Sequence, residues 1–558
     1  MKSLSFLPAT GGFLLRGPLF TACLVAALHA ATPPASFDVR ALGAKGDGHT
    51  LDTAAINRAI DEAAAAGGGT VTFPAGTYLS YSIHLRSHVA LYLDQGARIL
   101  AADPPPVGTP GGYDAPEPNP SNEYQDFGHT HWHNSLIWGE NVQDVSILGP
   151  GMIDGEGLSR GFGRKDGPPG LHTHWPKHGD VTPGVTGTFT PGPFGWPSAH
   201  DALPAGVGNK AIALKNCRNI ILRDFTIFHA GHFGILATAA DNLTIDNLKI
   251  DTNRDGMDID CCQNVHIANC TVNSPYDDGI CLKSSFALGY KRPTENVTIT
   301  NCQVSGFEEG SLLDGTFKKD PNPRGRPTGR IKLGTEANGG FKNIAISNCT
   351  FDYCCGLALE EVDGGSMQNI VVSNLTMRDI VNAPIYICLG ARLRGPNHPP
   401  IGTARRIKIS SVVASGVSSP QGIIIDGVAG HPVQDLSLSD ILIRFNGQVK
   451  TAPTSYAVPN FAKAYPEPSV YGTLPAYGLF ARHVQGLTLD HVELQLSSPD
   501  ARPALLLDHV ADAELLRLRA DHAPTTPILV QNDVTGLEVR DCRDVLDTPA
   551  PAVATPRP

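Results

Sequence analysis

The sequence predicts an all-β protein: a right-handed parallel β-helix, a solenoid of stacked coils with a short N-terminal capping helix and long loop insertions. Three observations lead to this prediction. A six-residue pattern recurs along the chain, and its copies start about 22 residues apart in the clearest stretch. Gly and Pro are abundant, with 59 and 45 of 558 residues, which is typical of a turn-rich fold. An amphipathic segment precedes the coils and would cover the open end of the solenoid.

The repeated pattern is Asn, aliphatic, any residue, aliphatic, any residue, Asn. Within each copy the aliphatic residues alternate, which is the period of a half-buried strand. A spacing of about 22 residues fits three short strands and three turns per coil. Asn side chains at the same turn of successive coils can then hydrogen-bond to their neighbours above and below. The strict copies lie at 242–247, 264–269, 296–301, 343–348 and 369–374, and looser copies lie at 219–224, 435–440, 486–490 and 536–541.

Other segments fit the same plan. Residues 52–65 are predicted to form the capping helix, with Asp52 near its start. The stretches 102–140 and 158–208 interrupt the repeat and are rich in Pro, Gly, His and Trp, so we interpret them as long loops leaving the coils.

The cysteines do not form the pattern of a small disulfide-bonded domain. Of the twelve, eleven remain after residue 31, and no two are spaced as CxxC. We expect most of them to be buried, with one or two disulfides. Cys270, Cys302 and Cys349 each follow an Asn of the repeat and should stack on one another.

The two ends of the chain are expected to lie outside the fold. Lys2 and Arg16 flank an apolar stretch that is followed by small residues, which is the pattern of a Sec-type signal peptide. We therefore interpret residues 1–31 as an export signal and expect a secreted or periplasmic protein. Residues 32–548 are predicted to be a single parallel β-helix domain, and residues 549–558 a disordered tail.

The composition excludes several classes of protein. Asp and Glu number 54 and Lys and Arg 43, which gives a formal net charge of −11. Nucleic-acid-binding proteins are usually basic, so we expect no nucleic acid partner. A content of 41% hydrophobic residues excludes a disordered chain. Beyond the signal peptide no apolar run reaches the roughly 18 residues of a membrane span.

The repeat also aligns titratable residues. Equivalent positions on adjacent coils lie about 4.8 Å apart, so residues at equal distances from the repeated Asn should gather on one face. Counting thirteen residues from the first Asn of successive copies gives His232, Asp255, Asp277 and Glu309, with Glu308 as the alternative to Glu309 and with Asp278 next to Asp277. Like charges so close raise one another's pKa, and the fold itself does not need them in a groove.

Carboxyl groups gathered in this way can cleave a glycosidic bond. One of them, protonated, donates to the leaving oxygen, while an ionised one takes a proton from water. The alternatives are a calcium site, or Asp side chains that stabilise turns, because Asp-Gly pairs are common in turns.

Three motifs resemble, in the same order, those of the polygalacturonase family, glycoside hydrolase family 28. They are Asn253-Arg254-Asp255, the Asp277-Asp278 pair and Arg330-Ile331-Lys332. Segments starting at Phe37 and Gly149 are also similar to the family, and the resemblance covers about residues 37–390. It implies an inverting glycoside hydrolase that acts on a galacturonic-acid-containing pectic polysaccharide or oligosaccharide.

The resemblance also implies roles for single residues. Asp277 would be the general acid, and Asp255 and Asp278 would hold and deprotonate the attacking water. Arg330 and Lys332 would bind a sugar carboxylate, for which a guanidinium and an ammonium are suited. Alternation along a strand places Arg330 and Lys332 on one side, facing one partner.

The sequence departs from the family pattern at two places. Arg254 stands where the family has Thr, and no Gly-His-Gly motif follows the Asp pair. At the matching place, residues 306–310 put Glu309 or Glu308 in the position of the family's His. These departures favour a different linkage, such as exo attack on the end of a branched or substituted pectic oligosaccharide.

Several assignments stay open at this point. Lys283 is either a further carboxylate contact or a paired structural cation. His129, His131 and His133 either bind a metal or belong to a loop whose Trp132 faces sugar rings. Arg392 and Arg394 either reach a distal subsite or are solvated. We expect a monomer without cofactor or metal; the alternative functions are a Ca²⁺-dependent polysaccharide lyase and a non-catalytic carbohydrate-binding β-helix.

Overall fold

The computed structural model describes residues 36–547, apart from 107–108, 127, 160–202, 204, 321–326 and 448. The predicted signal peptide and C-terminal tail lie outside these residues, as does most of the predicted loop 158–208. The described residues belong to one compact unit that begins at Ala35. In this part of the chain no helix has the length and apolar character needed to cross a membrane.

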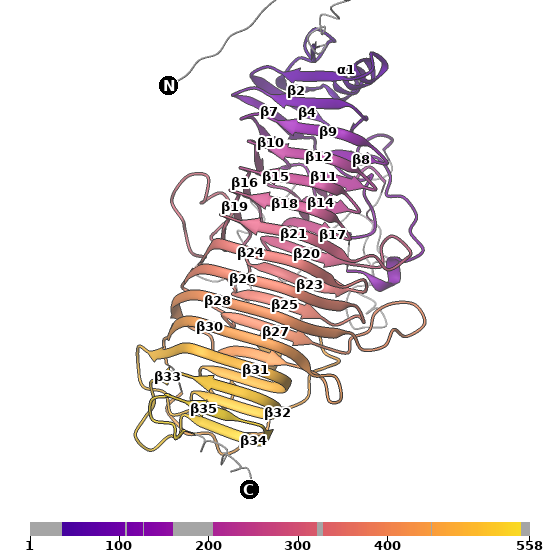
Figure 1. Ribbon diagram of the computed structural model, residues 1–558. Helices are drawn as coiled ribbons and strands as arrows, with labels where there is room; N and C mark the ends of the chain where they lie inside the picture. Colours follow the sequence, from indigo (N-terminus) through magenta and orange to yellow (C-terminus); the bar gives the residue numbers. More distant parts are fainter. Residues whose placement is uncertain are drawn as a thin grey trace, which may run out of the picture. The chain divides into compact units, whose positions relative to one another are not determined.

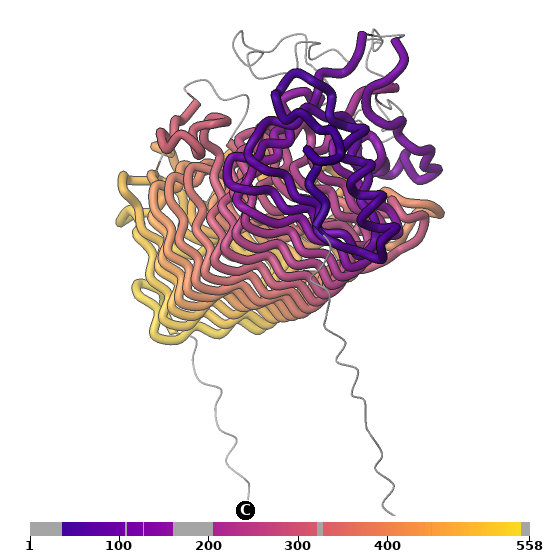
Figure 2. The backbone as a smooth tube through the Cα atoms, turned by 90° about the horizontal axis from the view of Figure 1, so that it is seen from above, coloured from indigo at the N-terminus to yellow at the C-terminus, as the bar shows by residue number. Residues whose placement is uncertain are grey.

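The predicted right-handed parallel β-helix is confirmed. Strands of successive coils pair in parallel, for example Leu243 with Val265 and Val265 with Val297. Figure 1 shows the strands stacked in chain order, and Figure 2 shows that successive coils lie over one another and bend at the same places. Each coil contributes one strand to each of three columns.

The first column carries the candidate site and runs through most of the molecule. It consists of β5 (Ile83–His84), β8 (Ile137–Glu140), β11 (Lys210–Lys215), β14 (Phe233–Thr238), β17 (Asp255–Asp260), β20 (Ile280–Ser284), β23 (Ile331–Ala337), β25 (Leu357–Glu361), β27 (Ile385–Leu389) and β29 (Ile423–Asp426). It ends with the first residues of β31 (Leu479–Leu496) and β32 (Leu505–Leu516) and with β34 (Leu529–Thr535).

The other two columns complete each coil. The second contains β1 (Ser36–Asp38), β3 (Gly69–Phe73), β6 (Val89–Leu93), β9 (Gln143–Leu148), β12 (Arg218–Arg223), β15 (Asp241–Asp246), β18 (Gln263–Ala268), β21 (Thr294–Thr300) and, at its end, β35 (Glu538–Arg540). The third contains β2 (Asp47–Leu51), β4 (Gly76–Ser80), β7 (Ala97–Ala101), β10 (Met152–Asp154), β13 (Thr226–Phe228), β16 (Lys249–Asp251), β19 (Thr271–Asn273), β22 (Gln303–Ser305) and β33 (Arg519–Ala520). Five longer strands span both columns: β24 (Phe341–Asp352), β26 (Ser366–Arg378), β28 (Thr403–Val417), β30 (Val433–Phe445) and β31, which begins in the first column.

The alternating aliphatic residues of the repeat fill the interior of the solenoid. Leu243 and Ile245 of β15 are fully buried and lie level with Val265 and Ile267 of the next coil. The residues between them are exposed or half-buried. A core of this kind is stabilised coil by coil, because each coil buries its apolar side chains against its neighbours.

The predicted Asn ladder is present. Each repeated Asn donates from Nδ2 to Oδ1 of the Asn one coil earlier, and the chain of contacts runs through Asn219, Asn242, Asn264, Asn296, Asn343 and Asn369 with distances of 2.8–3.3 Å. All six have φ between 50° and 59°. Asn tolerates this left-handed conformation better than most residues, so one residue type serves both the bend and the contact between coils.

The cysteines differ in part from expectation. The eleven that the structure describes are free thiols, so the expected one or two disulfides are not found among them. Ten are buried and Cys542 is half-buried. Cys270, Cys302 and Cys349 are stacked and hydrogen-bonded through their thiols, as predicted.

The capping helix is confirmed as α1 (Thr53–Ala65). Its buried face, which includes Ile56 and Ile60, packs on β1, β3 and β5. Asp52 precedes the helix, but its carboxylate accepts the backbone N–H groups of Lys45 and Gly46 at 2.6 and 2.9 Å instead of capping it. Two short 3-10 helices, η1 (Asn122–Tyr124) and η3 (Pro468–Tyr471), lie in loops that leave the coils.

Candidate active site

The candidate site lies on the outer side of the first column of strands. Every residue of β14, β17, β20, β23 and β25 is buried, on both faces of the strands. Inward side chains belong to the core, and the outward ones include the charged residues Asp258, Lys283 and Lys332, which loops cover. An all-buried column of this kind differs from the second column, where outward residues face solvent.

The three predicted acids meet. Oxygen atoms of Asp255, Asp277 and Asp278 all lie within 4.8 Å of one another. Asp255 begins β17, and the Asp pair stands just before β20. The juxtaposition that the sequence predicted is therefore confirmed.

The register inside this group differs by one residue from the prediction. Met257 of β17 lies level with Ile280 of β20, an offset of 23 residues, which places Asp255 level with Asp278 and not with Asp277. The strands on the preceding face are offset by 22, as Asp251 pairs with Asn273. The turn before β20 thus contains one residue more than the turn before β17.

Glycines allow the neighbouring coils to approach at this point. Gly256 follows Asp255 inside β17, and a Cβ atom there would lie 2.4 Å from the carbonyl oxygen of Gly279. Any side chain would force the two coils apart. Gly256 therefore serves close strand packing, and the alternative that this Asp-Gly pair only forms a turn does not hold for Asp255.

Asp255 is the acid whose ionisation the site disfavours. Its side chain is 5% exposed. Burial raises the pKa of Asp255 well above its usual value, and the charges of Asp258 and Asp277 add to the effect. Nε2 of His232 lies 4.0 Å from Oδ2 of Asp255, so the predicted place of His232 beside the acids is confirmed.

Asp278 is in the opposite state. Burial opposes its ionisation, but the charges of Lys332 and Arg330 outweigh burial and hold the pKa of Asp278 well below its usual value. Arg330 Nε donates to Oδ1 at 2.8 Å, and Lys332 Nζ to Oδ2 at 3.0 Å. The two cations face one partner, as alternation predicted, and in this structure that partner is Asp278.

Asp277 is the most accessible of the three acids. Its side chain is 28% exposed, and its Oδ2 accepts a hydrogen bond from Nη2 of Arg254 at 2.7 Å. The three carboxyl groups thus have three different environments. Asp255 is buried beside other acids, Asp278 is paired with two buried cations, and Asp277 is paired with a partly exposed one.

Two comparisons with families match parts of the chain. A family described as "Right handed beta helix region" matches residues 204–318, and one described as "Rhamnogalacturonase A/epimerase, pectate lyase-like" matches residues 36–98. The chain is 23% identical over 479 residues to a "Probable polygalacturonase" of Vitis vinifera, covering 82% of this chain and 85% of that protein.

Two further relatives agree with this result. The "Exo-poly-alpha-D-galacturonosidase" of Dickeya chrysanthemi is 25% identical over 382 residues, which are 64% of this chain and 57% of that protein. The fold is similar to that of the family 28 exopolygalacturonase of Yersinia enterocolitica, with a TM-score of 0.56 at 19% identity, over 92% of this chain and 79% of that one. The chain is therefore similar in sequence to proteins named as polygalacturonases and similar in fold to a family 28 exopolygalacturonase.

The departure from the family 28 pattern at Glu309 has a structural counterpart. Glu309 is half-buried in the segment that follows β22. Burial raises the pKa of Asp251 to about 6, and the charge of Glu309 adds to that effect. Glu309 therefore acts on the third column, at the strand that leads into β17 and Asp255.

Lys283 is a paired cation, one of the two roles left open by the sequence. Its Nζ donates to Oε2 of Glu336 at 3.1 Å and lies 3.8 Å from Oδ2 of Asp258. His129 lies 2.9 Å from the same oxygen of Asp258. These four buried residues form a cluster of ionisable side chains next to Asp255.

The other open assignments are also decided by burial. His129, His131 and His133 have separate partners, namely Asp258, the Glu117 carbonyl and Glu140, so they do not converge on one metal. Trp132 is fully buried against Phe233 and does not face sugar rings, contrary to expectation. Arg392 and Arg394 are buried and paired with Asp363, Asp126 and Glu336, so they are not solvated.

Sequence reasoning missed four acids of this region. Glu336 could have been found, because it continues the alternation of Arg330 and Lys332 on one strand, whereas Asp258 lies at an odd spacing from Asp255 and gives no such signal. Glu360 of β25 and Glu467 carry no such signal, although Glu360 lies 3.8 Å from Lys332 and Glu467 lies 3.1 Å from Arg330.

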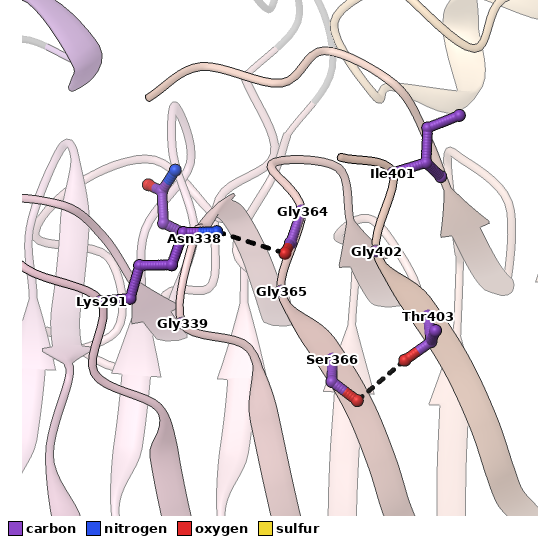
Figure 3. Close-up of a pocket in the computed structure, with 9 residues that line it drawn as sticks. All are labelled: Lys291, Asn338, Gly339, Gly364, Gly365, Ser366, Ile401, Gly402 and Thr403. Atoms are coloured by element: carbon purple, nitrogen blue, oxygen red, sulfur yellow. Dashed lines mark hydrogen bonds between the residues drawn. The ribbon is translucent and has the colours of Figure 1, made fainter. Parts of the chain in front are cut away.

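A separate hollow lies at the other end of the strands. Its volume is about 370 Å³, and it is lined mainly by glycines and by Asn338 and Lys291 (Figure 3). Lys291 Nζ reaches the Gly364 carbonyl at 3.5 Å, and the Ser366 and Thr403 hydroxyls lie 2.8 Å apart. The acids precede β17 and β20, whereas this hollow follows β23 and β25, so it is not part of the acid cluster.

Proposed function

We propose that the protein hydrolyses the glycosidic bond of a galacturonic-acid-containing pectic polysaccharide or oligosaccharide, and that it acts from a chain end. The observation that carries the proposal is the meeting of Asp255, Asp277 and Asp278 within 4.8 Å in unlike electrostatic states. Hydrolysis of a glycoside needs both a neutral and an ionised carboxyl group at one place. The polygalacturonase relatives support the substrate class.

The roles follow from the environment of each acid. Asp278 is ionised and fixed by Arg330 and Lys332, so it is suited to take a proton from water. Asp255, whose pKa is raised by burial, can hold that water through hydrogen bonds. Asp277 is the most exposed of the three acids, so we assign to it the contact with the leaving oxygen and the donation of a proton, once a substrate carboxylate draws Arg254 away.

The stereochemical course is part of the proposal. By resemblance to family 28 we propose inversion. The carboxyl groups of inverting enzymes are generally about 6.5–9.5 Å apart and those of retaining enzymes about 5–5.5 Å, and the oxygens here are within 4.8 Å. The 4.8 Å joins nearest oxygen atoms and not whole carboxyl groups, so proton NMR of the first-formed anomer is the deciding measurement.

Attack at a chain end is supported by the covering of the first column. Residues around Trp132 pack over β11 and β14, and residues 456–476 pack over β25, β27 and β29. Loops that pack over the column on both sides of the acids leave more room for the end of a polymer than for its middle. The relative from Dickeya chrysanthemi is named as an exo-acting enzyme. We also propose that the protein acts outside the cytoplasm, on the basis of residues 1–31.

The decisive experiment measures reducing-sugar release from polygalacturonate and from a panel of pectic oligosaccharides. Asp277→Asn should lower the rate by about three orders of magnitude or more and leave thermal unfolding nearly unchanged. Asp533→Asn, at an exposed position in β34, is the matched control and should behave as wild type.

Three results would contradict the proposal. Retained activity of Asp277→Asn would remove the acid from the mechanism. An unsaturated product that absorbs ultraviolet light, formed only without chelator, would indicate the lyase alternative. Binding without turnover on the whole panel would indicate the carbohydrate-binding alternative.

A further inference from the structure

The two cations assigned to a sugar carboxylate already face carboxyl groups of the protein. Arg330 contacts Asp278 through Nε, and its Nη2 lies 3.1 Å from Oε2 of Glu467. Lys332 contacts Asp278, and Glu360 lies 3.9 Å from Arg330 and 3.8 Å from Lys332. Two cations thus stand against three carboxyl groups, and the positive charge that would attract a uronate is compensated.

Glu467 is held in place from both sides of its carboxyl group. Arg330 donates to Oε2, and the side-chain amide of Asn382 donates to Oε1. The residue stands directly before η3, whose Val470 N–H closes onto the Glu467 carbonyl at 3.0 Å. Its side chain is 28% exposed, so a ligand at Arg330 would meet it.

The segment that carries Glu467, residues 456–476, is anchored across the first column; we call it the strap. Its apolar side chains, among them Phe461 and Tyr471, pack on residues of β25, β27 and β29. The Tyr471 hydroxyl donates to Asp426 at 2.6 Å, and Arg482 joins that same Asp426 to the Val458 carbonyl. The strap is therefore packed and hydrogen-bonded onto the first column, and this packing fixes the position of Glu467.

We propose that Glu467 is a specificity-determining residue that excludes a free carboxylate from the sugar position at Arg330, so that this position takes a neutral or esterified sugar. The proposal rests on the proposed function, which places substrate at Arg330. A uronate there would have to displace Glu467 or lie beside its negative charge. A sugar hydroxyl would instead donate a hydrogen bond to the Glu467 carboxylate.

The test uses a matched pair of disaccharides. One is α-1,4-linked digalacturonate, and the other is the same molecule with the reducing-end carboxylate replaced by a hydroxymethyl group. Isothermal titration of wild type and Glu467→Gln with both compounds needs no turnover. Glu467→Gln should bind digalacturonate at least tenfold more tightly than wild type does, while its affinity for the neutral-ended compound stays within about threefold.

Kinetics and controls complete the experiment. In wild type kcat/KM should favour the neutral-ended disaccharide at least tenfold, and Glu467→Gln should reduce that ratio through KM for digalacturonate. Glu514→Gln, at an exposed position of β32, should leave both affinities unchanged. Glu467→Ala and thermal unfolding of all variants separate a loss of charge from a disturbed strap.

The binding results test the role of Glu467 separately from the proposed hydrolysis. Equal affinity of wild type and Glu467→Gln for digalacturonate overturns the role of Glu467, whether or not the protein turns the compounds over. A wild type that binds digalacturonate more tightly than the neutral-ended compound overturns it as well. Binding that shifts as expected without any hydrolysis would support the exclusion and refute the enzymatic function.

Discussion

Nη2 of Arg254 lies 2.7 Å from Oδ2 of Asp277. The residue that departs from the family 28 motif thus contacts the acid to which the family resemblance assigns proton donation. A guanidinium at this distance stabilises the ionised carboxylate. The unusual residue therefore occupies a carboxylate oxygen of the acid that would contact the leaving group.

Replacing Arg254 by Thr, the family residue, should release Asp277 from this pairing. The Asp277 carboxyl group then reaches the leaving oxygen without first displacing a guanidinium, so kcat/KM should rise about tenfold. The measurement is kcat/KM of wild type and Arg254→Thr on the same substrate. Arg254→Lys keeps the charge and should stay within about threefold of wild type; a rise of equal size in both variants would contradict the assignment.

Glu360 makes the stability depend on pH. Burial raises the pKa of Glu360 from 4.5 to about 7. Between these values the folded protein holds a proton that the unfolded chain has lost, so the free energy of unfolding falls as pH rises and stays low above pH 7. Glu360→Gln removes this penalty, which amounts to about 3 kcal/mol.

Chemical denaturation at pH 5 and pH 8 checks this prediction. The difference in unfolding free energy between Glu360→Gln and wild type should be larger in favour of the variant at pH 8 than at pH 5. A difference that is independent of pH would show that Glu360 is ionised throughout, held by Lys332 and Arg330.

Asn296 allows the two tasks of the Asn ladder to be measured separately. It donates to Asn264 and accepts from Asn343, at 3.2 Å each, and has a φ of 58°. Asn296→Gly keeps the backbone relaxed and loses only the contacts, which should cost about 1 kcal/mol at this exposed site. Asn296→Ala adds the backbone penalty of about 1–2 kcal/mol. Equal unfolding free energies for the two variants would show that the left-handed conformation costs nothing here.

The thiols should be unreactive in the folded protein. Burial raises the pKa of Cys217 to about 11 and that of Cys355 to about 12, and of the eleven described thiols only Cys542 is not buried. In a protein without residues 1–31, a thiol reagent should modify at most one cysteine before unfolding and eleven in denaturant without reductant. A lower count in denaturant would reveal the disulfides that the sequence led us to expect.

The fold could be predicted because the repeat marks the same structural positions in every coil. An Asn marks the bend, and two alternating aliphatic residues mark the strand. The same spacing predicted that the acids lie close together. It could not predict their register, because one additional residue in the turn before β20 places Asp278, and not Asp277, level with Asp255. The spacing of the Asn repeat on one face of the solenoid does not give the lengths of the turns that lead to another face.

The positions of the loop residues could not be predicted from the sequence. Trp132 was expected to face a sugar, and it is buried instead against Phe233. Glu467 gave no signal, because the strap has no periodicity and reaches the site through tertiary packing alone. Lys283 could have been assigned once Glu336 was placed by alternation, since two opposite charges then lie on adjacent buried strands.

Arg330 and Glu467 are 137 positions apart in the chain. The acids to which we assign hydrolysis and the group that we assign to substrate choice are therefore encoded in separate stretches of the gene. Exchanging or shortening the later stretch can therefore change the sugar that the protein accepts. The coils that carry the acids stay unchanged, so substrate preference can evolve without altering those acids.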